Sequence, residues 1–354
     1  MDKKNIAIII LSLGLAALIA RTWYVRDYTQ IMAVTGATPL AINKEAPSGL
    51  TLKVTGMLKK QYEFGSRALN AFASTRIRTR EVSPAGAFEG TYIYNGIPLF
   101  NILEGVAPKK SKTAAFDRPL DMVVKVISSS GKTSLFSYGE LTMTDDRHPV
   151  TLAFYRSELK PTKDPEKYDK NIHHGPIKGL RLVCPKDTDT GRYLDDVVEI
   201  SLGLLPSPDA VLPAMKKGAE CSAASLTCIS GEKTAAASFA GVESASKDNW
   251  VRVGHGRGYK SISSLSGYGL RGFLKKNFFG CGPDDFFLFV ACDGYRCLFS
   301  GREIFSTEDG KGMLLAREID GKNPAGNIML APAEDYFVDR DIWGLSHIVM
   351  IRAR

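Results

Sequence analysis

Three arginines alternate with other residues in the segment STRIRTREV, residues 74–82. Arg76, Arg78 and Arg80, hereafter the arginine ladder, are two residues apart, so a β-strand would place all three guanidinium groups on one face. Like charges at this spacing repel each other unless the face is solvated or meets an anion. The pattern therefore predicts either a solvated edge strand or a strand that binds an anionic ligand or partner.

The cysteines and histidines lack the spacing of known metal and nucleophile motifs. The sequence contains no C-x-x-C, no H-E-x-x-H, no P-loop and no G-x-S-x-G. Cys292 and Cys297 flank Asp293-Gly294, a hairpin turn signal, so these two either face each other across two strands or stay buried thiols. The other cysteines are Cys184, Cys221, Cys228 and Cys281. We therefore predict no metal and no haem.

The composition is that of a folded, moderately basic protein. The 354 residues are 44% hydrophobic and 24% charged, with a formal net charge of +8. This balance argues against extensive disorder. Lysine and arginine are spread along the chain without a basic stripe that contains aromatic residues, so we predict no nucleic-acid binding. The excess positive charge favours an anionic lipid surface or an acidic partner.

The N-terminus has the features of a targeting segment. Lys3 and Lys4 precede an apolar run, residues 6–20, and Arg21 follows it. The run is short for a membrane span, but Leu18 would occupy the position of a signal-peptide cleavage site that favours a small residue. We therefore predict that residues 1–26 form a membrane anchor or signal segment. The protein would then be membrane-anchored, with its bulk on the periplasmic or extracellular side.

Two parts of the chain match each other in order. LFSYGEL (135–141) reappears as LFSGREI (298–304), KVTG (53–56) parallels CISG (228–231), and YNGIPLFNIL (94–103) parallels LSGYGLRGFL (265–274). LVCP (182–185) likewise parallels MLAP (329–332). PLDMVVKV (119–126) also parallels PDDFFLFV (283–290), and Leu152-Ala153 parallels Leu315-Ala316. These six matches in one order predict a tandem repeat. The expected parts are a stalk at 27–49, a first domain at 50–202, a linker at 203–224 and a second domain at 225–354.

The repeated unit resembles the sulfite oxidase-like domain of molybdopterin-dependent oxidoreductases. The first copy has Gly96-Ile97-Pro98-Leu99, Leu152-Ala153 and the segment HGPIKGLRLVCP from His174 to Pro185, and the second has Asp293-Gly294-Tyr295 and Leu315-Ala316. The resemblance covers most of residues 50–354. It implies an α+β, strand-rich fold of two tandem sulfite oxidase-like, molybdopterin-binding-type domains after an N-terminal transmembrane or signal segment.

The resemblance also implies a cofactor site in the first copy. His174, Arg181 and Arg192 would contact the phosphate and pterin of molybdopterin, because arginine suits phosphate, and the arginine ladder would line the approach. The family's molybdenum-binding cysteine falls at or near Val82, and no cysteine precedes Cys184. The site therefore lacks the soft thiolate ligand that the metal needs.

The same residues also have ordinary structural interpretations. Arg181 could extend to a surface acid. Arg192 lies beside Asp195 and Asp196 in the sequence, which favours a surface ion pair. His174 follows a polar stretch, where an exposed loop histidine is common.

Two functions follow from these observations. The first is a non-catalytic binding or scaffold subunit of a membrane-side complex, a pseudoenzyme whose partners are other membrane or periplasmic protein subunits. The alternative is a molybdopterin-dependent oxidoreductase that lacks the usual cysteine ligand and is active in the first copy. The missing thiolate favours the first function, whereas Arg181 and Arg192 favour the second. Whether the chain is an enzyme stays open at this point.

Overall fold

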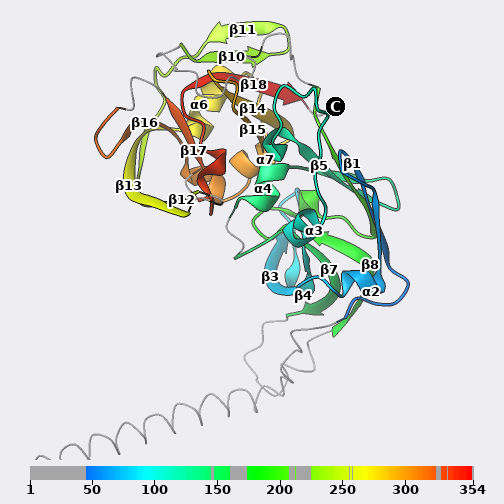
Figure 1. Cartoon of the computed structure of the whole chain (residues 1–354). Coiled ribbons are helices and arrows are strands. Elements are labelled where there is room, and N and C mark those ends of the chain that lie inside the picture. Colours follow the sequence, from blue (N-terminus) through cyan, green and yellow to red (C-terminus); the bar gives the residue numbers. More distant parts are fainter. Residues whose placement is uncertain are drawn as a thin grey trace, which may run out of the picture.

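The computed structural model describes residues 45–144, 147–159, 174–206, 212, 225–254, 256, 258–323, 328–332 and 334–352. Strands account for 51% and helices for 16%, and the longest described helix has eight residues. Four small sheets in a propeller-like arrangement form the body of the molecule (Figure 1). The protein is therefore mainly β.

Residues 51–203, the first half, form two of the sheets. Their strand orders are β2-β1-β9-β5-β6 and β3-β4-β7-β8. The strands are β1 (Thr51–Gly56), β2 (Tyr62–Gly65), β3 (Thr75–Val82), β4 (Phe88–Pro98), β5 (Val123–Ser128), β6 (Thr133–Ser137), β7 (Thr151–Glu158), β8 (His174–Val183) and β9 (Val197–Gly203). The helices are α2 (Ser66–Leu69), α3 (Leu99–Gly105), α4 (Tyr138–Thr142) and the 3₁₀ turns η1 (Pro119–Asp121) and η3 (Thr190–Arg192).

Residues 227–352, the second half, form the other two sheets. Their strand orders are β11-β10-β18-β14-β15 and β12-β13-β16-β17. The strands are β10 (Thr227–Ser230), β11 (Lys233–Ala236), β12 (Ser244–Gly254), β13 (Gly258–Gly269), β14 (Asp285–Ala291), β15 (Arg296–Ser300), β16 (Met313–Ile319), β17 (Met329–Pro332) and β18 (Leu345–Arg352). The helices are α6 (Leu270–Asn277), α7 (Gly301–Phe305), η5 (Asp309–Gly312) and η6 (Val338–Arg340).

The strand order of the first half corresponds to that of the second, position by position. In each half the first strand pairs in parallel with the last, β1 with β9 and β10 with β18. LFSYGEL lies on β6 and α4, and LFSGREI lies on β15 and α7. The sequence matches of the two halves therefore fall on corresponding elements.

Burial explains the sequence patterns of the strands. Exposed arginines alternate along β3 with buried Ile77, Thr79 and Glu81, because only one face of this strand is covered. This alternation confirms that the arginine ladder occupies one face. By contrast, β14 is apolar on both faces: Phe287 belongs to the core of the second half, and Phe286 belongs to a cluster that includes Val123 of the first half. The latter cluster joins the two five-stranded sheets.

The repeated Leu-Ala pairs have a steric explanation. β4 passes β7 at Gly96, where an added Cβ would lie 2.3 Å from the carbonyl oxygen of Leu152. β13 passes β16 in the same way at Gly267, where an added Cβ would lie 2.1 Å from the carbonyl oxygen of Leu315. In both cases the added Cβ would clash with backbone atoms of the neighbouring strand. The two strands could make room for it only by moving apart, which would break their hydrogen bonds.

We expect Gly267→Ala to lower the free energy of unfolding by about 1–3 kcal/mol, the usual range for overpacking. Gly272→Ala in α6 is the matched control, because its Cβ would lie 3.7 Å from the nearest atom and alanine favours a helix. Chemical denaturation of both variants measures the difference. Equal stability of the two variants would show that β13 and β16 can separate freely.

The cysteines are mostly reduced. Cys184, Cys228, Cys281 and Cys297 are free thiols, and Cys292 is disulfide-bonded. The strands on either side of Asp293-Gly294 form the hairpin β14–β15. Cys292 and Cys297 nevertheless form no disulfide across this hairpin, because Cys297 is a free, buried thiol.

The predicted α+β fold class is wrong. Each described helix spans about one or two turns, which is too little to form a helical layer beside a sheet. Leu99–Gly105, for example, form the helix α3, which ends after seven residues. Most residues in regular secondary structure instead belong to the strands of small sheets.

The predicted membrane anchor at 1–26, most of the stalk and most of the linker lie outside the described residues. Within the described ranges, no helix is long and apolar enough to cross a membrane. The described chain therefore gives no support for the predicted membrane-anchored location on the periplasmic or extracellular side.

Candidate functional site

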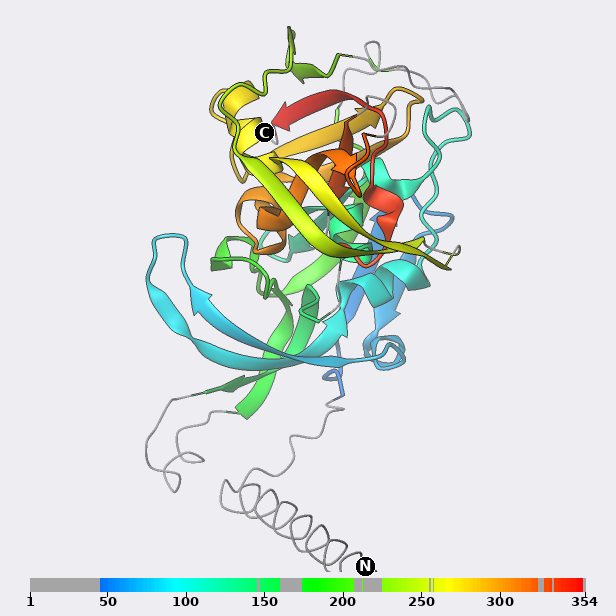
Figure 2. The ribbon, with the colours of Figure 1, turned by 90° about the vertical axis from the view of Figure 1, so that its left-hand side faces the viewer.

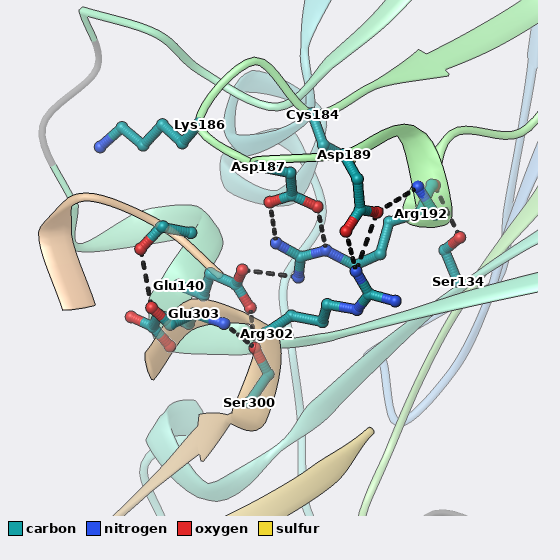
Figure 3. Close-up of polar contacts among 12 residues, drawn as sticks. Ser134, Glu140, Cys184, Lys186, Asp187, Asp189, Arg192, Ser300, Arg302 and Glu303 are labelled. Carbon is teal, nitrogen blue, oxygen red and sulfur yellow. Dashed lines mark hydrogen bonds and ion pairs between the residues drawn. The ribbon is translucent and has the colours of Figure 1, made fainter. Parts of the chain in front are cut away.

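Arg192 lies in η3, where the two halves meet. The residue is 5% exposed. Its Nε and Nη2 donate to Asp187 Oδ2 and Oδ1 at 2.8 and 2.6 Å, and its Nη1 lies 2.6 Å from Glu140 Oε1 (Figure 3). The guanidinium carbon lies 4.4 Å from the centre of the Phe136 ring. Two buried carboxylates and one aromatic ring thus surround this cation.

Arg340 lies in η6 and has the same surroundings in the second half. It is 0% exposed. Its Nε and Nη2 donate to Asp335 at 2.6 and 2.5 Å, and its Nη1 donates to Glu303 Oε1 at 2.5 Å. Its guanidinium carbon lies 4.4 Å from the centre of the Phe299 ring. The two arginine sites are therefore counterparts in the two halves.

Two serines connect these sites across the junction. Ser137 and Ser300 each cap a helix, because their Oγ atoms accept from the backbone N–H of Glu140 and Glu303 at 3.0 Å. Each hydroxyl also donates to the glutamate of the other half: Ser300 to Glu140 Oε2 at 2.8 Å, and Ser137 to Glu303 Oε2 at 3.3 Å. We call the set of two arginines, their four carboxylates and these two serines the junction network.

Backbone contacts between the halves surround the junction network. Thr144 forms a β-bridge with Asp335, and Thr307 forms one with Asp187. Both aspartates that bind the arginines are therefore held by the opposite half. Such reciprocal contacts fix the halves against each other.

Further ion pairs cross the junction on the side of the first half. Asp189 accepts two bonds of 3.0 Å from Arg302 Nη1 (Figure 3). Lys186 Nζ lies 2.6 Å from Asp309 Oδ2. Ser134 donates to the carbonyl oxygen of Arg192 at 2.7 Å. These contacts hold the chain around η3 in place.

A cavity of about 40 Å³ adjoins the junction network, and Cys184, Lys186 and Asp309 are among its lining residues. This is room for a few water molecules, whereas small-molecule sites usually measure about 300–1,000 Å³. Burial raises the pKa of the Cys184 thiol and keeps it protonated. The arrangement holds charges in place and offers no nucleophile.

Arg181 is also paired within the protein. Its Nη1 donates to Asp195 Oδ1 at 2.5 Å, and its Nη2 lies 3.4 Å from Glu81 Oε2. The Asp195 side chain is 70% exposed, which agrees with the interpretation that Arg181 extends to a surface acid. His174 begins β8 opposite Ser157, and its side chain lies outside the described residues.

Two of the residues that the resemblance assigns to molybdopterin, Arg181 and Arg192, do not fit that cofactor. Arg192 is already paired with Asp187 and Glu140, and the adjoining cavity is too small. The cavity beside Arg181 is larger, about 590 Å³, but no cysteine is among its lining residues, and Arg181 is paired there with Asp195. Val82, the position expected for the molybdenum ligand, ends β3. No group of three or more potential metal ligands occurs among the described residues.

The arginine ladder does not share a face with Arg181. Glu81, which contacts Arg181, alternates with the ladder along β3 and so projects from the opposite face. Arg192 lies in the junction network, away from both. The structure therefore separates the predicted site residues into three places.

Sequence reasoning missed the junction network, although a signal for it was present. Both LFSYGEL and LFSGREI carry the S-x-x-E spacing of a capping box. Both closing segments also carry an aspartate five residues before an arginine, Asp187 before Arg192 and Asp335 before Arg340. The predicted partners of Arg192, Asp195 and Asp196, are wrong: its partners are Asp187 and Glu140.

Comparison with solved structures found distant similarity. No protein-family model and no curated protein matches the chain. Among solved structures, the chain is similar to the crystal structure of the sulfane dehydrogenase SoxCD from Paracoccus pantotrophus, with 13% identity and a TM-score of 0.32. The match covers 88% of this chain and 80% of that chain. A similarity this remote establishes neither a family nor an activity.

Proposed function

We propose that this protein is a non-catalytic binding protein that contacts an acidic partner protein through the arginine ladder. The observation that carries the proposal is the contrast between two kinds of arginine. Arg181 and Arg192 are held by internal carboxylates. The three ladder arginines are exposed, and no contact within the described chain involves their guanidinium groups.

The ladder is well placed for such contact. β3 is the edge strand of its sheet, so both its arginine face and its free backbone groups are available to another chain. Figure 2 shows the β3–β4 hairpin curving away from the rest of the molecule. Consecutive ladder residues are about 6–7 Å apart along a strand. Acidic side chains at alternate positions of an extended segment have the same spacing and the opposite charge.

We expect the triple variant R76S/R78S/R80S to bind poly-L-glutamate about 10- to 100-fold more weakly at low salt, from three exposed ion pairs of about 0.5–1 kcal/mol each. The measurement is biolayer interferometry on immobilised poly-L-glutamate at two salt concentrations. Because exposed pairs are screened, the difference from the unmodified protein should shrink at high salt.

The control is K59S/K132S/K233S, which removes three exposed lysines that do not form a row. It changes the net charge by the same amount, so any loss from net charge alone appears in both variants. We expect the control to retain most of the binding and both variants to keep the unfolding temperature of the unmodified protein. Equal loss of binding in the two variants would contradict the proposal and show that the ladder is only a solvated strand face.

A further inference from the structure

A third cavity, of about 290 Å³, lies beside η6 and includes Arg118 of the first half in its lining. Its lining includes carboxylates, cations and an aromatic ring: Asp339, Asp341, Arg118, Lys260 and Trp343. None of these residues belongs to the junction network or to the arginine ladder. The volume is close to the lower limit for small-molecule sites, about 300 Å³.

Asp341 is the most unusual group in this cavity. The residue is 6% exposed, and its Oδ2 has no hydrogen-bond partner among the described residues. Buried polar atoms are nearly always paired, so an unpaired carboxyl oxygen that lines a cavity calls for a donor from outside. Burial and the nearby Asp335 carboxyl raise the pKa of Asp341 well above its usual range. A cationic donor would stabilise its charged form.

The first half shows how the equivalent position is normally filled. Tyr193 directly follows Arg192 just as Asp341 follows Arg340, and the next residue in each case bridges to the preceding strand, Leu194 to Leu182 and Ile342 to Leu330. The Tyr193 ring lies under the guanidinium of Arg181 at 5.6 Å. In the second half the smaller aspartate leaves the space open.

The cations around this space form no ion pair with Asp341 among the described residues, although Arg252 and Lys260 are near enough to oppose the rise of its pKa. Lys260 is exposed and forms no ion pair within the described chain. Arg252 lies over the rings of Trp250 and Trp343 at 5.0 and 5.2 Å, and its Nε is buried without a partner. Arg118 lies 3.9 Å from Asp339 Oδ1 at the rim. The cavity thus offers an unpaired acceptor and an unpaired cation side by side.

We propose that this cavity binds a small zwitterion of the α-amino-acid type. Its ammonium group donates to the Asp341 carboxyl group, and its carboxylate is bound by Lys260 and Arg118. A simple anion would meet Asp339 and Asp341, and a simple cation would meet Lys260 and Arg118. Only a ligand that carries both charges satisfies both sides.

Isothermal titration calorimetry with L-alanine tests the proposal, with acetate and methylammonium as ligands that each carry one of the two charges. We expect alanine to bind at least about 10-fold more tightly than either. Lys260→Gln should weaken alanine binding about 10-fold, and Lys276→Gln, an exposed lysine on α6, should leave it unchanged. Asp341→Asn should abolish the preference for the ammonium group.

Lys260 is exposed, so its variant folds and keeps the test valid even if the buried Asp341 variant does not. Absence of alanine binding up to about 10 mM, which corresponds to a free energy weaker than about −3 kcal/mol, would overturn the proposal and leave a water-filled cavity. Acetate binding as tight as that of alanine would overturn it as well, in favour of a plain anion site.

Discussion

Arg340→Met should lower the free energy of unfolding by about 3–5 kcal/mol, the loss expected when one partner of a buried ion pair is removed. The Arg340 side chain is 0% exposed and lies between the carboxylates of Glu303 and Asp335. Without the guanidinium group, both carboxyl groups remain buried beside each other, and any charge that they carry is left without a cation. Urea denaturation at neutral pH measures this loss.

Arg67→Met is the matched control for that experiment. Arg67 is exposed on α2, so we expect its replacement to change stability by no more than about 0.5 kcal/mol. The triple variant R340M/E303Q/D335N should recover part of the stability, because it removes the charges that Arg340 balances. A loss below about 1 kcal/mol for Arg340→Met alone would show that solvent reaches the junction network.

The second large effect is a fall in stability as the pH rises, caused mainly by Glu303. Burial raises the pKa of Glu303 to about 8 and that of Asp335 to about 6, although Arg340 opposes both shifts. In the unfolded chain these groups titrate near about 4.3 and 3.9. Between those ranges the folded protein holds protons that the unfolded chain has released, so stability decreases with increasing pH.

We expect the free energy of unfolding to fall by a few kcal/mol, an order-of-magnitude value, between about pH 5 and pH 9. Glu303→Gln cannot ionise, so its stability should depend much less on pH across this window. Glu308→Gln, which removes an exposed carboxylate near the same helix, should keep the slope of the unmodified protein. The measurement is urea denaturation at a series of pH values. Identical slopes for the two variants would mean that Glu303 is ionised throughout.

The sequence allowed local features to be predicted better than distant ones. The period of two in residues 76–80 correctly predicted an exposed arginine face, because strand alternation depends only on neighbouring residues. The partner of Arg181, the exposed acid Asp195, lies close to it in the sequence and fits the same kind of reasoning. In contrast, the partners of Arg192 include Glu140, which only the folded chain brings near.

The contacts within the junction network and around Asp341 were harder to predict, because they too depend on residues that are distant in the sequence. The exchange of hydroxyl donors between Ser137 and Ser300 depends on how two sheets pack, and no local pattern reveals that packing. The unpaired oxygen of Asp341 depends on the absence of a neighbour, which a sequence cannot display. The α+β class was wrong because it was taken from the family resemblance, which does not fix the length of the helices; the longest described helix has eight residues.

The central position of β18 has a consequence for synthesis of the chain. This strand lies between β10 and β14 and joins the hairpins β10–β11 and β14–β15 into one sheet. On the ribosome, both hairpins emerge before residues 345–352, so each presents an unpaired inner edge until the last of these residues is free. Such edges associate readily with other chains. A message truncated before residue 345 therefore yields an aggregation-prone product rather than a shorter folded protein.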